Sequence, residues 1–211
     1  MEPVVKHLGI VEYAPLWQAM QSFTAARVAD TPDEIWVLQH PPVYTLGLAG
    51  RIEHILRSTT PIPIIRTDRG GQVTYHGPGQ LVVYTLLNVK RLGLSVRALV
   101  RRLERAVIHT LAQHYAIDAY GDKSAPGVYV QGDKIAALGL RIRHGASYHG
   151  LALNVAMDLA PFSDINPCGY TGLKVTQLSA LGITATVDEV ADKLLPHLLE
   201  QLTLAAGKET E

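Results

Sequence analysis

The stretch TDRGGQVTYHGPGQLVVYTLLN, residues Thr67–Asn88, decides how the chain is organised. It contains two glycine breaks, GG at 70–71 and GPG at 77–79, and an apolar run from Leu81 to Leu87. The β-branched and aromatic residues of that run predict a buried strand. Because glycine has no Cβ, a ligand can approach the backbone closely at both breaks. The stretch therefore indicates a ligand-binding wall, and a plain polar loop between strands is the alternative interpretation.

The rest of the chain predicts an α+β domain with a strand-rich middle. Its most specific signal is a meander from Gly127 to Met157, whose first two strands join across Gly132-Asp133. Gly139 and Gly150 inside these strands indicate bulges or room for a ligand. No linker or repeat is visible, so residues 1–211 are expected to form one domain. Helices are predicted at 15–28, 95–115 and 176–181 and from residue 186 onward, and strands at 35–39, 43–48, 62–67, 127–131, 134–143 and 147–157.

Two of the predicted helices carry recognisable start signals. Ser95 can cap the helix at 95–115, and Thr186–Glu189 has the spacing of a capping box. Pro196 is expected to kink the last helix.

The helix at 95–115 is predicted to have an apolar side and a basic side. Apolar residues recur every three or four positions and face the core. The other side carries Arg97, Arg101 and Arg105, with Arg102 beside them. A solvated surface is the ordinary interpretation of such a row, and a dock for an acidic carrier protein is the sharper one.

Composition excludes several classes of protein. The 211 residues have a formal net charge of zero, which argues against attraction of the whole molecule to nucleic acid or to anionic membranes. No apolar run approaches the ~18 residues that would span a bilayer, and no signal region precedes the first predicted helix. We therefore expect a soluble, cytoplasmic protein. With 47% hydrophobic residues, a sizeable core is available.

A metal site is not expected from the cysteines and histidines. The one cysteine, Cys168, cannot form an intramolecular disulfide or a cysteine-rich zinc site. The nine histidines show no metal-binding spacing, and His109 and His114 lie five residues apart on different sides of a predicted helix.

Cys168 is nevertheless a candidate nucleophile. A lone cysteine is usually a small buried hydrophobic residue, but this one stands between a proline and a glycine in a polar loop. Such a thiol needs a nearby cation or base to become a thiolate at neutral pH. Lys134, His76 and His149 are the candidates, and spacing alone does not choose among them.

Four segments together resemble the lipoate-protein ligase B family, the octanoyltransferases. They are RGGQVTYHGPGQLVVYTLLN, GDKIAALGLRI, SYHGLALN and NPCGYTGL, in this order. The resemblance covers the chain from Val37 to about Leu181. It implies the α+β fold of biotin and lipoate ligases and class II synthetases, with a mixed or antiparallel sheet flanked by helices. The chain lacks the Gly-Arg-Gly-Arg-x-Gly pattern and the extra C-terminal domain of related ligases, which argues against ATP-dependent activation.

The resemblance implies the first step of endogenous protein lipoylation. The octanoyl group would come from the phosphopantetheine arm of acyl carrier protein. It would pass through a cysteine thioester to a lysine of lipoyl domains, in 2-oxoacid dehydrogenases and in the glycine cleavage H protein. No permanently bound cofactor is implied.

The resemblance also implies roles for individual residues. Cys168 matches the nucleophile and Lys134 its partner. His76 and His149 we interpret as wall or supporting groups, with a satisfied structural histidine as the alternative. Backbone N–H groups of Cys168-Gly169 or Gly70-Gly71 are candidate oxyanion donors. The implied substrate wall consists of Arg69, Gly70, Gly71, Gln72, Val73, Thr74, Tyr75, His76, Ala137, Leu138, Gly139, Gly150, Leu151 and Ala152.

Three other functions stay open at this point. An ATP-using lipoate ligase would need no thiol. A non-catalytic binder would hold acyl or lipoyl domains without turnover. A thioesterase would release octanoate when no acceptor is present.

Overall fold

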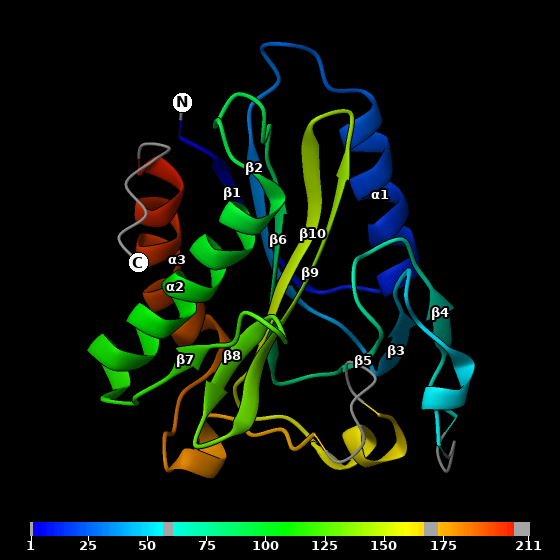
Figure 1. The fold of residues 1–211 in the computed structure, drawn as a ribbon, viewed down its shortest axis with the longest axis vertical. Coiled ribbons are helices and arrows are strands. Elements are labelled where there is room, and N and C mark those ends of the chain that lie inside the picture. Colours follow the sequence, from blue (N-terminus) through cyan, green and yellow to red (C-terminus); the bar gives the residue numbers. More distant parts are fainter. Residues whose placement is uncertain (1, 57–60, 167–172, 205–211) are drawn as a thin grey trace.

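A seven-stranded mixed sheet forms the centre of the protein (Figure 1). The computed structural model describes residues 2–56, 61–166 and 173–204. In the sheet, β1 and β2 pair in parallel and all other neighbours are antiparallel. The strand order is β1 (Val4–Ile10), β2 (Glu34–Gln39), β6 (Gln80–Leu86), β10 (Ala146–Asn154), β9 (Asp133–Arg143), β8 (Gly127–Val130) and β7 (Tyr120–Gly121).

A smaller sheet stands beside the main one. Its order is β4 (Ile64–Arg66), β3 (Val43–Leu46) and β5 (Val73–His76). An aromatic and aliphatic cluster around Tyr44, Tyr75 and Phe162 packs behind it. Short 3-10 helices span Ile52–His54, Ala160–Asp164 and Ser179–Leu181.

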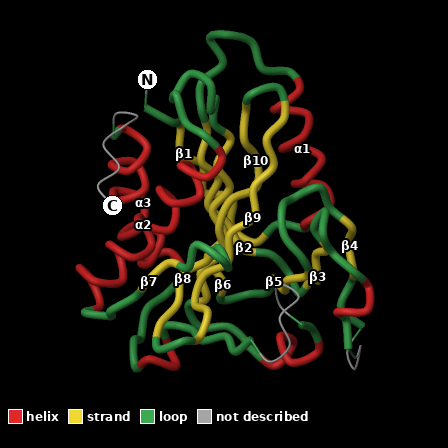
Figure 2. Tube along the Cα trace, viewed as in Figure 1, coloured by secondary structure: helices red, strands yellow, loops and turns green. Residues whose placement is uncertain are grey.

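Helices cover both faces of the main sheet (Figure 2). α1 (Tyr13–Ala25) packs on one face, against β6 and β10. α2 (Val96–Tyr115) and α3 (Val187–Thr203) pack on the other face, over the largest apolar cluster. The α+β class and the sheet flanked by helices, both expected from the sequence, are therefore confirmed. No helix among the described residues is long and apolar enough to cross a membrane.

The predicted caps are present. The Ser95 side chain accepts a hydrogen bond from the N–H of Ala98, and Thr186 with Glu189 forms the complete capping box. Arg102, in contrast, does not belong to the solvated basic side of α2. It is buried and donates to the carbonyl oxygens of Gln201 and Leu204, at the end of α3. Carbonyl groups at the end of a helix generally have no donor within the helix, so they can stabilise a buried guanidinium.

Several element boundaries differ from the expectation. The predicted hairpin turn is displaced by one residue, because Val130 pairs with Asp133 and the turn is Gln131-Gly132. Both turn residues have positive φ, as a two-residue turn with the twist of the strands requires. β1 was not predicted, since it is an edge strand with mostly exposed side chains and no clear alternation. The other predicted elements are present with shorter or shifted ends.

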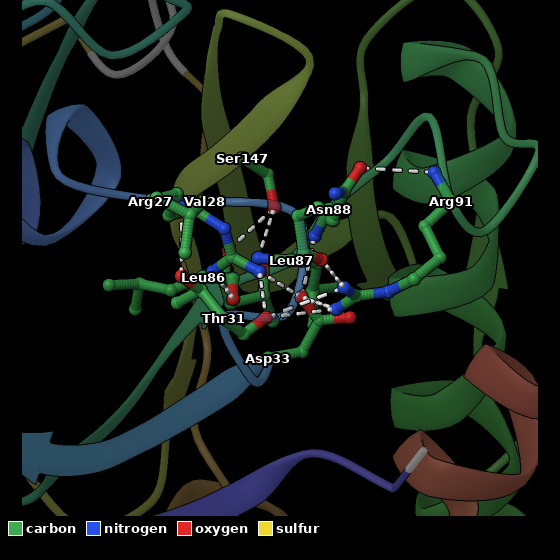
Figure 3. Close-up of polar contacts among 11 residues, drawn as sticks. Arg27, Val28, Thr31, Asp33, Leu86, Leu87, Asn88, Arg91 and Ser147 are labelled. Carbon is green, nitrogen blue, oxygen red and sulfur yellow. Dashed lines mark hydrogen bonds and ion pairs between the residues drawn. The ribbon is translucent and has the colours of Figure 1, made fainter.

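A buried carboxylate joins three segments at one end of the main sheet (Figure 3). Asp33, just before β2, forms ion pairs with Arg27 and with Arg91, the latter at 2.8 Å. It also accepts a hydrogen bond from the N–H of Asn88 at 2.7 Å. Because Asp33 is buried, these partners compensate the cost of removing its charge from water. The contacts fix the end of α1 against the turn that follows β6.

Candidate functional site

A pocket lies on the α1 face of the main sheet, where the loop at 69–72 and β5 pass over β9 and β10. We call it the β9–β10 pocket. It holds about 520 Å³ of space between atoms, the open solvent at its mouth included. Its lining consists of Tyr13, Arg69, Gly71, Gln72, Val73, Thr74, His76, Val82, Tyr84, Ala137, Leu138, Gly139, His149, Gly150, Leu151 and Ala152.

Most of the expected substrate wall lines this one pocket. Two expected residues lie elsewhere. Gly70 lines a neighbouring cavity, and Tyr75 packs between Tyr44 and Phe162 behind the small sheet. Tyr13, Val82 and Tyr84 line the pocket but are not among the candidates. Tyr13 lies outside the four motifs, and Val82 and Tyr84 belong to the apolar run that predicts only a buried strand.

The floor of the pocket depends on two glycines that face each other. Gly139 in β9 pairs directly with Gly150 in β10. A Cβ on Gly150 would stand 2.0 Å from the carbonyl oxygen of Val83, and one on Gly139 would stand 3.0 Å from that of Gly70. The bulge expected at these glycines is absent, since the β9–β10 register is continuous through them. The groups that approach these two glycines closely are the backbone carbonyls of Val83 and Gly70, which belong to the protein itself.

Arg69 holds the loop that covers the pocket. Its guanidinium is buried and donates to the hydroxyl and the carbonyl oxygen of Thr45, the latter at 2.7 Å. It also donates to the carbonyl oxygens of Gly70 at 2.9 Å and Gln72 at 2.7 Å. One planar group therefore joins β3 to both ends of the 70–72 turn. Its charge adds a fixed positive potential to the pocket wall.

His149 stands at one end of the pocket in a strained conformation. Its φ is +61°, unusual for a residue with a side chain, and its Nε2 lies 3.1 Å from Asp68. Asp68 also accepts from Trp17, Gln21 and Tyr148. Burial raises the pKa of Asp68, but these hydrogen bonds outweigh it and hold the pKa well below its usual value. Burial lowers the pKa of His149. At neutral pH the pair is thus a carboxylate and a neutral imidazole that donates to it.

His76 is also neutral at physiological pH. Its Nδ1 lies 2.7 Å from the side-chain oxygen of Gln80. Burial, together with the nearby His40, lowers the pKa of His76 to about 3. Burial also lowers the pKa of His40 to about 4. The imidazoles in and behind the pocket wall are therefore uncharged. Arg69 is the positively charged residue among those that line the pocket.

Lys134 lies beyond the other end of the pocket, at the start of β9. Its side chain is buried, with a residue exposure of 4%. The Nζ atom donates to the carbonyl oxygen of Pro126 at 3.2 Å and lies 5.1 Å from the centre of the Tyr129 ring. Lys134 lines a smaller cavity together with Thr74 and Ala137, and these two residues also line the β9–β10 pocket. Thr74 and Ala137 therefore lie between Lys134 and the β9–β10 pocket.

Cys168 lies outside the described residues. The chain on either side of residues 167–172 is held by backbone hydrogen bonds. The N–H of Asn166 donates to the carbonyl oxygen of His54 at 2.8 Å, and Val175 forms a parallel bridge with Lys134. Among the described residues, no group of three His, Cys, Asp or Glu side chains is arranged to hold a metal ion.

The chain is similar in sequence to known proteins. The family model for the lipoyl protein ligase A/B catalytic domain matches residues 12–199. A protein named octanoyltransferase from Chromobacterium violaceum is 60% identical over 210 residues, covering 100% of both chains.

Solved structures share the fold at low identity. The putative lipoate protein ligase Ta0514 of T. acidophilum, with bound lipoic acid, has a TM-score of 0.79 at 18% identity. That match covers 96% of this chain and 86% of the other. Biotin protein ligase from Aquifex aeolicus has a TM-score of 0.57 at 17% identity, covering 96% and 70%.

Proposed function

Since this chain belongs to the lipoate-protein ligase B family and is an octanoyltransferase, we propose that it works through an enzyme-bound thioester on Cys168. The donor in this proposal is the octanoyl group on the phosphopantetheine arm of acyl carrier protein. The acceptor is a lysine of a lipoyl domain, in 2-oxoacid dehydrogenases or the glycine cleavage H protein. No ATP is consumed, because the donor thioester already carries the activation.

One observation carries the proposal. The buried ammonium of Lys134 adjoins a pocket lined largely by apolar groups, and the backbone of Lys134 is paired with the segment that follows Cys168. A thiol brought near that ammonium loses its proton more easily, because the positive charge favours the thiolate. The pairing supports placing the nucleophile at the Lys134 end of the pocket.

The proposed reaction has two acyl transfers. In the first, the Cys168 thiolate attacks the carbonyl carbon of the donor. A new carbon–sulfur bond forms, the bond to pantetheine breaks, and Lys134 protonates the departing thiolate. In the second, the acceptor amine attacks the enzyme thioester and an amide bond forms. The neutral Lys134 amine takes the proton of the incoming amine, and the Cys168 thiolate leaves.

The octanoyl chain is proposed to lie in the β9–β10 pocket. Val73, Val82, Leu138 and Leu151 supply apolar contacts there. At about 0.8 kcal/mol for each buried methylene, a chain of eight carbons contributes several kcal/mol to binding. Length preference follows, because the Asp68–His149 pair bounds one end of the pocket with polar groups.

The oxyanion donors can be narrowed. The N–H of Gly70 donates to the carbonyl oxygen of Leu140 at 2.9 Å, so this amide is already used. The proposal therefore assigns the oxyanion to the N–H of Gly71 or to amides of the Cys168-Gly169 loop.

Intact-mass analysis tests the proposal. Protein incubated with octanoyl acyl carrier protein should gain one octanoyl group that hydroxylamine removes, as expected of a thioester. The variant Cys168→Ser should gain no such group, while Lys174→Met, which changes an exposed lysine nearby, should react like the wild type. Normal transfer by Cys168→Ser, or transfer that depends on ATP, would refute the proposal. Release of octanoate in place of transfer, with an acceptor domain present, would identify a thioesterase.

A further inference from the structure

A second cavity lies on the other side of the loop that covers the β9–β10 pocket. It holds about 870 Å³ of space between atoms, its open mouth included. We call it the α2 groove, because the start of α2 forms one wall. Its lining residues are Gly70, Gly71, Gln72, Val96, Val100, Ser124, Ala125, Pro126, Leu138, Gly139 and Leu140.

The groove exists because β8 is short. Gly127, the first residue of β8, pairs with Ala137. From Leu138 onward, β9 pairs only with β10 among the described strands. The loop approaches the edge left open, where Gly70 donates to Leu140. Between that loop and the turn at 124–126, the edge of β9 remains accessible.

The groove adjoins both parts of the proposed active site. Gly71, Gln72, Leu138 and Gly139 line it and also line the β9–β10 pocket. Pro126, at its other end, accepts the hydrogen bond from the ammonium of Lys134. A ligand in the groove is therefore separated from the acyl chain by one loop, and its end can lie beside Lys134.

The chemistry of the groove fits an elongated, uncharged arm with a charged outer end. Its sides are apolar, and Val96 at the rim is 48% exposed. Arg97, Arg101 and Lys123 are exposed and stand next in sequence to lining residues. Among the described carboxylates nearby, Asp122 accepts hydrogen bonds from Ser124, and the buried Glu104 accepts one from the N–H of Gly127, so neither opposes the three exposed cations in number. The rim is therefore positively charged on balance, which suits a phosphate and an acidic protein surface.

We propose that the α2 groove receives the pantetheine arm of the acyl carrier protein. This inference rests on the proposed function. The methyl and methylene carbons of the arm contact Val96, Val100 and Leu140, and its amides lie along the backbone of the 70–72 turn. The thioester then stands at the Lys134 end, with the arm and the octanoyl chain on opposite sides of that turn. The phosphate and the carrier protein remain outside, against the arginines of α2.

The test blocks the groove and compares two donors. Val100→Phe and Ala125→Phe narrow the groove from opposite walls, and Gln113→Phe places the same ring on the exposed far part of α2. The donors are octanoyl acyl carrier protein and octanoyl-N-acetylcysteamine, a thioester that lacks most of the arm. The rate of Cys168 acylation is followed by intact mass.

Both groove variants should lose about tenfold or more in kcat/KM for the carrier protein, equivalent to about 1.4 kcal/mol or more of transition-state binding. Acylation by the small thioester should stay within about twofold, as should all reactions of Gln113→Phe. Transfer from acylated enzyme to a lipoyl domain should also be unchanged in both groove variants. The paired change Arg97→Glu with Arg101→Glu should raise KM for the carrier protein alone.

Two results would overturn the inference. Groove variants that react with the carrier protein like the wild type would show that the arm lies elsewhere. An equal loss with both donors, in both variants, would show that the groove serves the acyl chain or the chemistry and not the arm. A different result would refute the proposed function: wild-type protein would acquire no octanoyl group from either donor. That result would also refute the assignment of the groove.

Discussion

The backbone N–H of Lys134 donates to the carbonyl oxygen of Lys174 at 3.0 Å, and this bond joins the start of β9 to the chain that follows Cys168 in the sequence. The N–H of Thr176 returns a bond to the carbonyl oxygen of Lys134 at 2.9 Å. Backbone pairing therefore fixes the position of the lysine without using its ammonium. The ammonium itself donates to the carbonyl oxygen of Pro126 in a buried site.

The first prediction concerns that ammonium. Lys134→Met keeps the backbone pairing and most of the packing but removes the acid and base. Octanoyl transfer to a lipoyl domain, measured by mass spectrometry, should fall by about 10² or more. Lys174→Met, in which only an exposed side chain changes, should retain the wild-type rate. A Lys134→Met enzyme with wild-type turnover would remove the lysine from the mechanism.

The second prediction compares the two paired glycines. Gly150→Ala should destabilise the protein more than Gly139→Ala, because its Cβ would meet the Val83 backbone inside the sheet at 2.0 Å. Overpacking of this kind costs about 1–3 kcal/mol or more, which urea denaturation can measure. Gly139→Ala meets the 70–72 turn at 3.0 Å, and that turn can move. Its main effect should be weaker binding of octanoyl donors, and equal losses of stability would contradict this assignment.

The third prediction concerns the buried carboxylate in Figure 3. Asp33→Ala should lower the free energy of unfolding by about 3–5 kcal/mol, because it leaves the buried Arg27 without its ion pair. Arg91→Ala should cost about 1 kcal/mol or less, since the Arg91 side chain is 37% exposed. Octanoyl transfer per folded molecule should be unchanged in Arg91→Ala. If urea denaturation shows that both variants lose a similar free energy of unfolding, the stabilising effect of Asp33 does not come mainly from its ion pair with Arg27.

The fourth prediction is a dependence of stability on pH. His40 is buried between the carbonyl oxygen of Val11 and the hydroxyl of Tyr84, and its pKa is lowered from 6.5 to about 4. The unfolded chain therefore binds a proton at a higher pH than the folded protein does. This contribution to stability is complete above pH 6.5 and is lost as the pH falls toward 4.

Between pH 6.5 and pH 5, His40 alone should reduce the free energy of unfolding by about 2 kcal/mol. His76, with its pKa lowered to about 3, acts in the same direction. Urea denaturation of wild type and His40→Gln across this range checks the sign. The variant should show a shallower pH dependence, and parallel curves would mean that His40 does not titrate as inferred.

Local patterns predicted the local structures well. The stripe and cap of α2, the capping box of α3 and the 127–157 meander all depend on residues a few positions apart. The hairpin turn was missed by one residue, because a glutamine at 131 adopts the positive φ that the pattern assigned to its neighbours. The edge strand Val4–Ile10 was missed because its side chains lack a buried face.

The sequence by itself determined the α+β class, the caps, the meander and most of the residues that line the β9–β10 pocket, because short motifs contain them. Only the tertiary structure decided that Tyr13 and Tyr84 enter the same pocket, that the guanidinium of Arg69 is used to hold β3, and that Lys134 is buried against Pro126. The reason is physical. Periodicity and turn chemistry act between neighbours in the chain, whereas these contacts join separate strands, helices and loops through packing and hydrogen bonds, whose partners no local pattern specifies.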